Sequence, residues 1–119
     1  MLFSSLVWGT SGKGAFITFS GSFNASASTA TVTGTSRTVT VVGGGSRTLD
    51  MLNESIGGTS LEYRYNAGAF ATVEGASISV ADASTLQFRA SGAATWTSTV
   101  DLYDHATGKF LTQVAISRV

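Results

Sequence analysis

The chain has 119 residues, a formal net charge of +0, 43% hydrophobic residues and no cysteine. This length predicts one domain, which buries roughly two-thirds of its unfolded surface in a single core. The hydrophobic content excludes an intrinsically disordered protein. The balanced charge lacks the basic footprint of nucleic-acid binding, so no nucleic-acid partner is expected. Disulfides and thiolate metal sites are excluded because there is no cysteine.

The N-terminal segment is apolar but lacks the pattern of an export signal. It contains no Lys or Arg near Met1, and Ser4 and Ser5 interrupt its apolar run, whereas a secretory signal has a basic region followed by an unbroken apolar one. No segment of the chain approaches the ~20 apolar residues of a membrane span. We therefore expect folding in the cytoplasm and no membrane partner. Residues 1–14 are interpreted as an N-terminal arm or as the first strand.

Turn residues and period-2 alternation divide the first part of the chain into short strands. A Gly-rich turn at residues 11–14 precedes a predicted strand at residues 16–19. Residues 24–35 consist mainly of Ala, Ser, Thr and Gly. Because such small side chains specify strand register weakly, this stretch is predicted to be an edge or contact strand.

The middle of the chain begins with a clearly predicted strand, but the secondary structure of its later residues cannot be assigned to one type. Val39 and Val41 share one face of a predicted strand at residues 37–42. The glycine run at residues 43–46 lacks the Lys and Ser/Thr of a phosphate loop and is interpreted as a flexible hairpin connection. Residues 51–56 are compatible with either a helical turn between sheets or a strand end.

Alternation is clearest in the second half of the chain. It predicts strands at residues 61–66, 85–90 and 100–103, a hairpin loop at residues 104–109 and a last strand after it. The residues predicted to face inward are Leu61, Tyr63, Tyr65, Leu86, Phe88, Val100, Leu102, Phe110, Val114 and Ile116.

These patterns predict an all-β fold, specifically an antiparallel two-sheet β-sandwich of immunoglobulin-like or jelly-roll type with about nine or ten strands. Residues 15–119 are expected to form this single domain. The chain has no proline, a residue that commonly protects exposed sheet edges. We therefore expect edges that pair with another chain, and a homo-oligomer such as a dimer or trimer.

No residue pattern predicts catalysis. His105 is the single histidine and lies near Asp101 and Asp104, but alternation directs these two acids to opposite faces and places His105 in a turn. A solvated hairpin tip is therefore expected there rather than a metal site. A Ser–His–Asp triad is formally available, yet the Gly-x-Ser-x-Gly nucleophile elbow is missing. We predict no catalytic, cofactor-binding or metal-binding residues and no cofactor.

Aromatic residues are the stronger candidates for a function. Tyr63 and Tyr65 share the phase of Leu61, which favours the core for both. Trp96 lies in a segment of small residues, where it serves either as a contact anchor, since interfaces favour Trp, or as a cap on the end of the sandwich. The predicted partner contacts are Phe3, Trp8 and Trp96.

The second half contains four segments in which a strand pattern is combined with turn residues. They lie at residues 61–70, 76–80, 83–91 and 100–104. Together, over roughly residues 60–119, they resemble small β-sandwich structural proteins of tailed bacteriophages and related bacterial immunoglobulin-like modules. Proteins of that kind decorate or cement capsids, or form parts of tails and fibres. The resemblance transfers no individual functional residues.

The resemblance implies a non-enzymatic virion protein, most specifically a capsid cement or decoration subunit that binds the major capsid protein and stabilises the shell. Virion proteins are assembled in the cytoplasm and later face the exterior, which fits a Ser/Thr-rich surface without an export signal. The alternative is a carbohydrate- or surface-binding module of a tail, fibre or adhesin. That alternative predicts an exposed Trp8 or Trp96.

Overall fold

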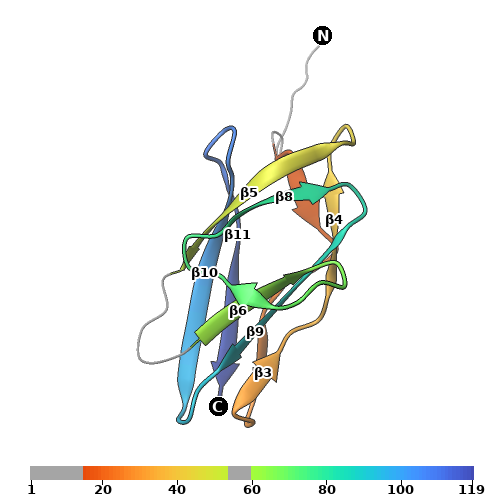
Figure 1. Ribbon diagram of the computed structural model, residues 1–119. Coiled ribbons are helices and arrows are strands. Elements are labelled where there is room, and N and C mark those ends of the chain that lie inside the picture. Colours follow the sequence, from red (N-terminus) through yellow and green to blue (C-terminus); the bar gives the residue numbers. More distant parts are fainter. Residues whose placement is uncertain (1–14, 54–59) are drawn as a thin grey trace.

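The computed structural model describes residues 15–53 and 60–119, in which every regular element is a β-strand (Figure 1). Residues 1–14 and 54–59, including Phe3 and Trp8, lie outside the described residues. The strands are β1 (Ile17–Phe19), β2 (Ala25–Ala27), β3 (Thr31–Thr33), β4 (Arg37–Val41), β5 (Ser46–Asn53), β6 (Ser60–Tyr65), β7 (Ala71–Thr72), β8 (Ser77–Ala81), β9 (Thr85–Ser91), β10 (Trp96–Asp104) and β11 (Phe110–Arg118).

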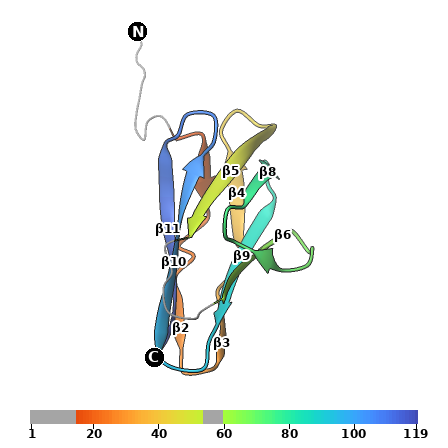
Figure 2. The ribbon, with the colours of Figure 1, turned by 60° about the vertical axis from the view of Figure 1, so that its left-hand side comes forward.

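The strands form two sheets that pack face to face, as Figure 2 shows from the side. Sheet 1 has the order β1-β4-β9-β6-β7, and β3 also pairs with β9. Sheet 2 has the order β2-β11-β10-β5-β8. The predicted all-β two-sheet sandwich is thereby confirmed. Residues 15–53 and 60–119 contain eleven strands, where nine or ten were expected for the chain, because strands of two or three residues, such as β7, are too short for alternation to reveal.

The core lies between the two sheets and contains the predicted inward-facing residues except Phe110. Val39, Leu86 and Phe88 from sheet 1 are fully buried, as are Val100 and Leu102 from sheet 2. Three phenylalanines form its aromatic centre: the ring of Phe23 packs edge-on against Phe19 at 4.9 Å and against Phe88 at 5.0 Å between centroids. Tyr63 and Tyr65 are partly buried and pack on this core, so the inward assignment of both is confirmed.

Phe110 was predicted to face inward, and this is wrong. The register between β10 and β11 shifts by one residue, because Leu102 pairs with Thr112 whereas Tyr103 pairs with Phe110. This bulge inserts Leu111 as an extra residue and reverses the facing of everything before it. Phe110 consequently lies on the outer face, where it is 52% exposed.

The glycine run after β4 is a connection between sheets and not a hairpin as predicted. It joins β4 of sheet 1 to β5 of sheet 2. Gly43, Gly44 and Gly45 have φ values of 89°, 81° and 78°, and residues with side chains rarely adopt these values. Three successive positive φ angles let the chain change sheets within a very short connection.

The low-complexity stretch contains two of the short strands. β2 is an outer strand of sheet 2, so the prediction of an edge strand is confirmed. The sandwich is not purely antiparallel, because β2 pairs with β11 in parallel, with Ala25 opposite Ile116. Residues 51–53 of the ambiguous segment belong to β5, and its remainder lies outside the described residues.

Candidate functional site

Residues of the three catalytic-triad types meet on the outer face of sheet 2, but in an order that does not support nucleophilic catalysis. The Ser77 hydroxyl donates to Asp50 Oδ1 at 2.6 Å, and His105 Nδ1 lies 2.8 Å from Asp50 Oδ2. The carboxylate therefore stands between serine and histidine, whereas a triad requires the imidazole in that position to take the serine proton. His105 is 62% exposed in its side chain, as expected for a hairpin tip.

The bonds to Asp50 stabilise its charged form. The Ser77 hydroxyl makes the largest contribution to lowering the pKa of Asp50, and His105 lowers it further, while partial burial opposes both. A carboxylate held ionised in this way is a poor general acid at neutral pH. The hydrogen bonds of this cluster connect β5, β8 and the 104–109 loop, and its role is structural.

A second polar cluster anchors the same hairpin loop from inside the sandwich. Asp104 is fully buried, and its carboxylate accepts two hydrogen bonds from Arg47, at 3.0 Å from Nε and 2.7 Å from Nη2. Thr107 donates a third bond, at 2.7 Å. Such bidentate pairing is among the strongest hydrogen bonding available to a carboxylate. Sequence patterns did not predict this cluster, because Arg47 is distant in sequence from Asp104.

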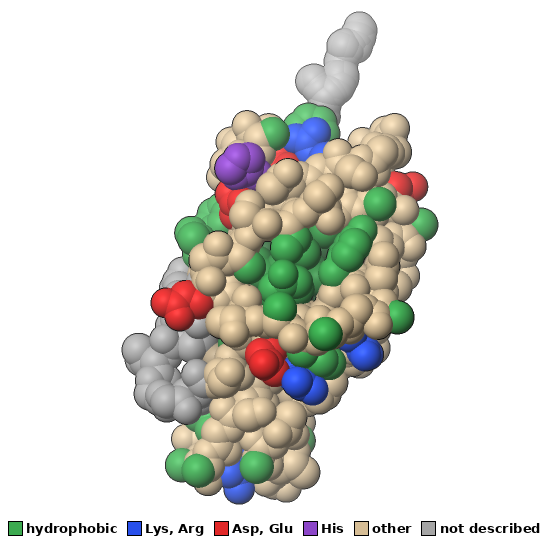
Figure 3. Space-filling model, in the orientation of Figure 1, with side chains coloured by type: hydrophobic (Ala, Val, Ile, Leu, Met, Phe, Trp, Pro, Cys, Tyr) green, Lys and Arg blue, Asp and Glu red, His purple; other side chains and the backbone are tan. Residues whose placement is uncertain are grey.

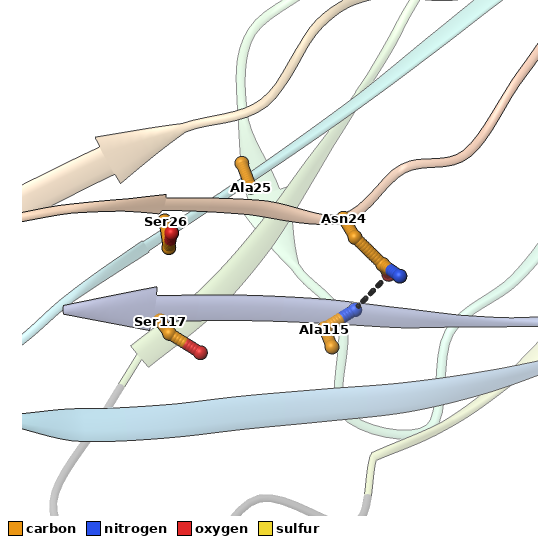
Figure 4. A pocket seen from close by; sticks show the side chains of 5 residues that line it. All are labelled: Asn24, Ala25, Ser26, Ala115 and Ser117. Carbon is orange, nitrogen blue, oxygen red and sulfur yellow. Dashed lines mark hydrogen bonds between the residues drawn. The ribbon is translucent and has the colours of Figure 1, made fainter. Parts of the chain in front are cut away.

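A shallow hollow lies where β2 runs beside β11 and is lined by Asn24, Ala25, Ser26, Ala115 and Ser117 (Figure 4). Asn24 closes one end, because its side-chain oxygen accepts a hydrogen bond from the backbone nitrogen of Ala115 at 2.9 Å. The lining contains no ionisable side chain. The hollow therefore offers hydroxyl and methyl groups for contact but no acid, base or metal ligand.

A third polar cluster covers the outer face of sheet 1. The guanidinium of Arg89 lies 3.8 Å from the centre of the Phe70 ring and bonds Glu62 at 2.8 Å, while Arg64 lies 5.0 Å from the same ring. Cation–π contacts of this kind hold both arginines against the sheet. Within this cluster Glu62 pairs with Arg89, whereas Arg64 donates to the neutral Gln87 at 2.7 Å and its buried Nε has no hydrogen-bond partner among the described residues.

The free edge of sheet 2 at β8 is the feature best suited to binding another chain. Among the described strands, β8 pairs only with β5, and its outward side chains include the exposed Ser77 and Ser79. Proteins usually protect such an edge with Lys, Pro or a bulge. The β8 strand contains none of the three.

Apolar side chains gather beside this edge, where the two sheets meet. The half-buried residues Tyr63 and Tyr65 of β6 and Ile78 of β8 pack on the core there. The Tyr65 hydroxyl bridges the sheets by accepting a hydrogen bond from the backbone nitrogen of Ala81 at 2.8 Å. Figure 3 shows hydrophobic side chains gathered between β8 and β6 on this face of the molecule. We call Tyr63, Tyr65 and Ile78 the seam.

Trp96, one of the predicted partner contacts, is buried. It begins β10 with only 8% of its surface exposed, and its indole ring fills the space that a side chain at Gly92 would occupy. Of the two interpretations of Trp96, the structure favours the cap over the contact anchor. The glycan-binding alternative thereby loses one of its two expected platform residues.

The burial of Trp96 predicts the wavelength of its fluorescence emission and how readily iodide quenches it. In a Trp8→Phe variant, Trp96 is the only tryptophan left, and we expect blue-shifted emission that iodide quenches poorly, since water and ions do not reach the ring. Red-shifted, readily quenched emission from the folded variant would show that Trp96 is accessible. The matched Trp96→Phe variant reports Trp8 under the same conditions.

No family model, curated protein or solved structure matches the chain. Within residues 15–53 and 60–119, no group of three or more His, Cys, Asp or Glu side chains is arranged to hold a metal ion. Across the same residues, no helix is long and apolar enough to span a membrane.

Proposed function

We propose that the chain is a non-enzymatic structural protein of a tailed-bacteriophage virion, a capsid cement or decoration subunit that binds the major capsid protein and stabilises the shell. The observation that carries this proposal is the unprotected β8 edge beside the apolar seam. The resemblance of the second half to phage β-sandwich proteins supplies the class of partner.

The mode of binding follows from the edge and the seam together. A strand of the capsid protein added beside β8 gains main-chain hydrogen bonds, and its apolar side chains cover Tyr63, Tyr65 and Ile78. Burial of apolar surface contributes about 25 cal/mol per Å² before the entropic costs of association. A formal net charge of +0 presents no electrostatic barrier to packing many copies close together. Self-association as a dimer or trimer around a symmetry axis is part of the proposal.

The composition of purified particles tests the proposal. We expect mass spectrometry to find the chain in many copies per particle, in a fixed ratio to the major capsid protein. Absence of the chain would contradict the proposal. A handful of copies would instead indicate a tail or neck component.

One pair of variants tests the binding mode. Ser79→Lys places a charge on the β8 edge and is expected to reduce the copies bound per particle, because strand addition would have to bury or displace the lysine. Thr97→Lys, at an exposed position inside sheet 2, is the matched control and should bind normally. Equal occupancy by the two variants would exclude β8 as the binding edge.

A further inference from the structure

The outer face of sheet 2 carries exposed apolar side chains around an acidic one. Leu52 is 53% exposed and Phe110 is 52% exposed, and the Tyr103 ring packs edge-on against Phe110 at 5.7 Å between centroids. Asp101 lies among them, because it is directly opposite Leu52 on β5 and shares β10 with Tyr103. Apolar groups gathered on a surface in this way commonly mark a contact with another molecule. We call Leu52, Asp101, Tyr103 and Phe110 the acidic patch.

The charge of Asp101 is not neutralised within the described chain. Its carboxylate accepts a hydrogen bond from the uncharged Gln113 at 3.0 Å, and it takes part in none of the ion pairs among residues 15–53 and 60–119. The other acid that the strands place on this face, Asp50, lies 2.8 Å from His105. The outer face of sheet 2 is therefore negative, and Asp101 is its unpaired charge.

The outer face of sheet 1 has the opposite charge. Its strands β6 and β9 place two arginines and one glutamate there, so one positive charge is in excess. Arg89 pairs with Glu62 at 2.8 Å. Arg64 instead donates to the uncharged Gln87 at 2.7 Å, and its buried Nε has no acceptor among the described residues. The half-buried Phe70 ring lies against both guanidiniums. We call Arg64, Phe70 and Arg89 the basic patch.

The two patches are complementary in charge but cannot meet within one molecule. They lie on faces that point away from each other across the core, as the two-sheet arrangement in Figure 2 shows. A contact between them therefore joins two copies of the chain. The formal net charge of +0 adds no general repulsion between these copies.

We propose that the basic patch of one copy binds the acidic patch of the next, with Arg64 facing Asp101 and Phe70 against the exposed apolar side chains. Such a heterologous contact uses a different surface on each partner, so it repeats from copy to copy as a row and does not close as a two-fold dimer. Apolar burial supplies most of the favourable free energy, and the facing charges fix which face is bound.

This contact is separate from the proposed capsid attachment, which uses the β8 edge and the seam, and from self-association around a symmetry axis. Neither of them is needed for it. The copy number in particles tests the virion function, whereas the contact is tested on the free protein, so the two proposals fail independently.

Sedimentation equilibrium of the free protein tests the contact. We expect the weight-average mass of the wild-type chain to rise from micromolar to millimolar concentration, as for a small and weak interface. Arg64→Glu and Asp101→Arg each bring like charges together, so each is expected to weaken association about tenfold or more. Glu74→Arg is the matched control and should associate like the wild type. It changes the net charge by as much as Asp101→Arg, but it lies in an exposed turn outside both patches.

An equimolar mixture of the two charge-reversed variants gives the decisive result. Each variant keeps one native patch and presents one reversed patch, so native can meet native and reversed can meet reversed. We therefore expect mixing to restore association to near the wild-type level. A mixture that stays monomeric would overturn the proposal, as would a single variant of Arg64 or Asp101 that associates as strongly as the wild type.

An uncharged substitution tests the apolar part and covers the case in which a reversed variant does not fold. Phe110→Ser removes an exposed ring from the acidic patch and should also weaken association. Val42→Ser is the matched control, because Val42 is 54% exposed but lies outside both patches, and it should associate normally. Circular dichroism verifies that both are folded. Equal association by these two variants, or a wild-type chain that stays monomeric at every concentration, would contradict the contact.

Discussion

Replacing Phe88 by Ala is expected to lower the free energy of unfolding by about 4 kcal/mol. Phe88 is fully buried on the central strand β9, and its ring contacts Phe23 edge-on at 5.0 Å. Truncation removes the transfer free energy of the ring and leaves a cavity beside Phe23, which well-packed neighbours fill only in part. A domain of this size is stable by about 5–15 kcal/mol in total, so the variant should unfold at a much lower urea concentration.

Phe110→Ala is the matched control for that prediction. The substitution is identical, but Phe110 is 52% exposed on the outer face, and surface substitutions usually change stability by less than about 0.5 kcal/mol. Urea titrations followed by circular dichroism measure both variants. Similar losses in the two would show that Phe88 is not in the core as described, or that Phe110 is buried under another segment.

Asp104→Asn is expected to lower the free energy of unfolding by about 2 kcal/mol at neutral pH, because hydrogen bonds to a charged group contribute about 1.5–3 kcal/mol. The buried carboxylate accepts bonds from Arg47 and Thr107. An amide keeps the shape but offers only one acceptor oxygen and carries no charge. Asp101→Asn, at a half-buried outward position bonded to Gln113, is the control and should change stability little.

The same variant changes the acid sensitivity of the protein. The hydrogen bonds from Arg47 hold the pKa of Asp104 below its usual value, and burial opposes them only in part. A lowered folded pKa adds stability above the unfolded pKa of about 3.9, and this stability is lost as the pH falls through the lower folded value. We expect the stability of the wild-type chain to fall in this acidic range more steeply than that of Asp104→Asn. Parallel pH profiles for the two proteins would rule out this role for Asp104.

Local alternation was sufficient to predict the sheet class and most of the core. In β9, for example, Leu86 and Phe88 alternate with polar residues, and both are fully buried. Such strands have one face in the core and one in water, so their sequence carries the period directly. The hairpin loop at residues 104–109 could also be predicted from the sequence, because its turn contains Asp104 and Gly108, residue types that favour turns.

Features that depend on pairing between distant strands could not be predicted in this way. The one-residue shift that turns Phe110 outward arises from the match between β10 and β11 and leaves the local alternation unchanged. The parallel pairing of β2 with β11 is likewise invisible in either strand alone. For the candidate site, the missing proline suggested open edges, but which strand is an edge depends on the order of strands in the sheet.

The pairing of β2 with β11 also has a consequence for synthesis on the ribosome. Ala25–Ala27 find their partners only at Ile116–Arg118, and the backbone nitrogen of Val119 donates to Ala27 at 2.8 Å. Sheet 2 therefore cannot close while residues 116–119 are still in the exit tunnel. Contacts of such large sequence separation slow folding, and during that interval the β11 side of β10 is unpaired and available to other nascent chains.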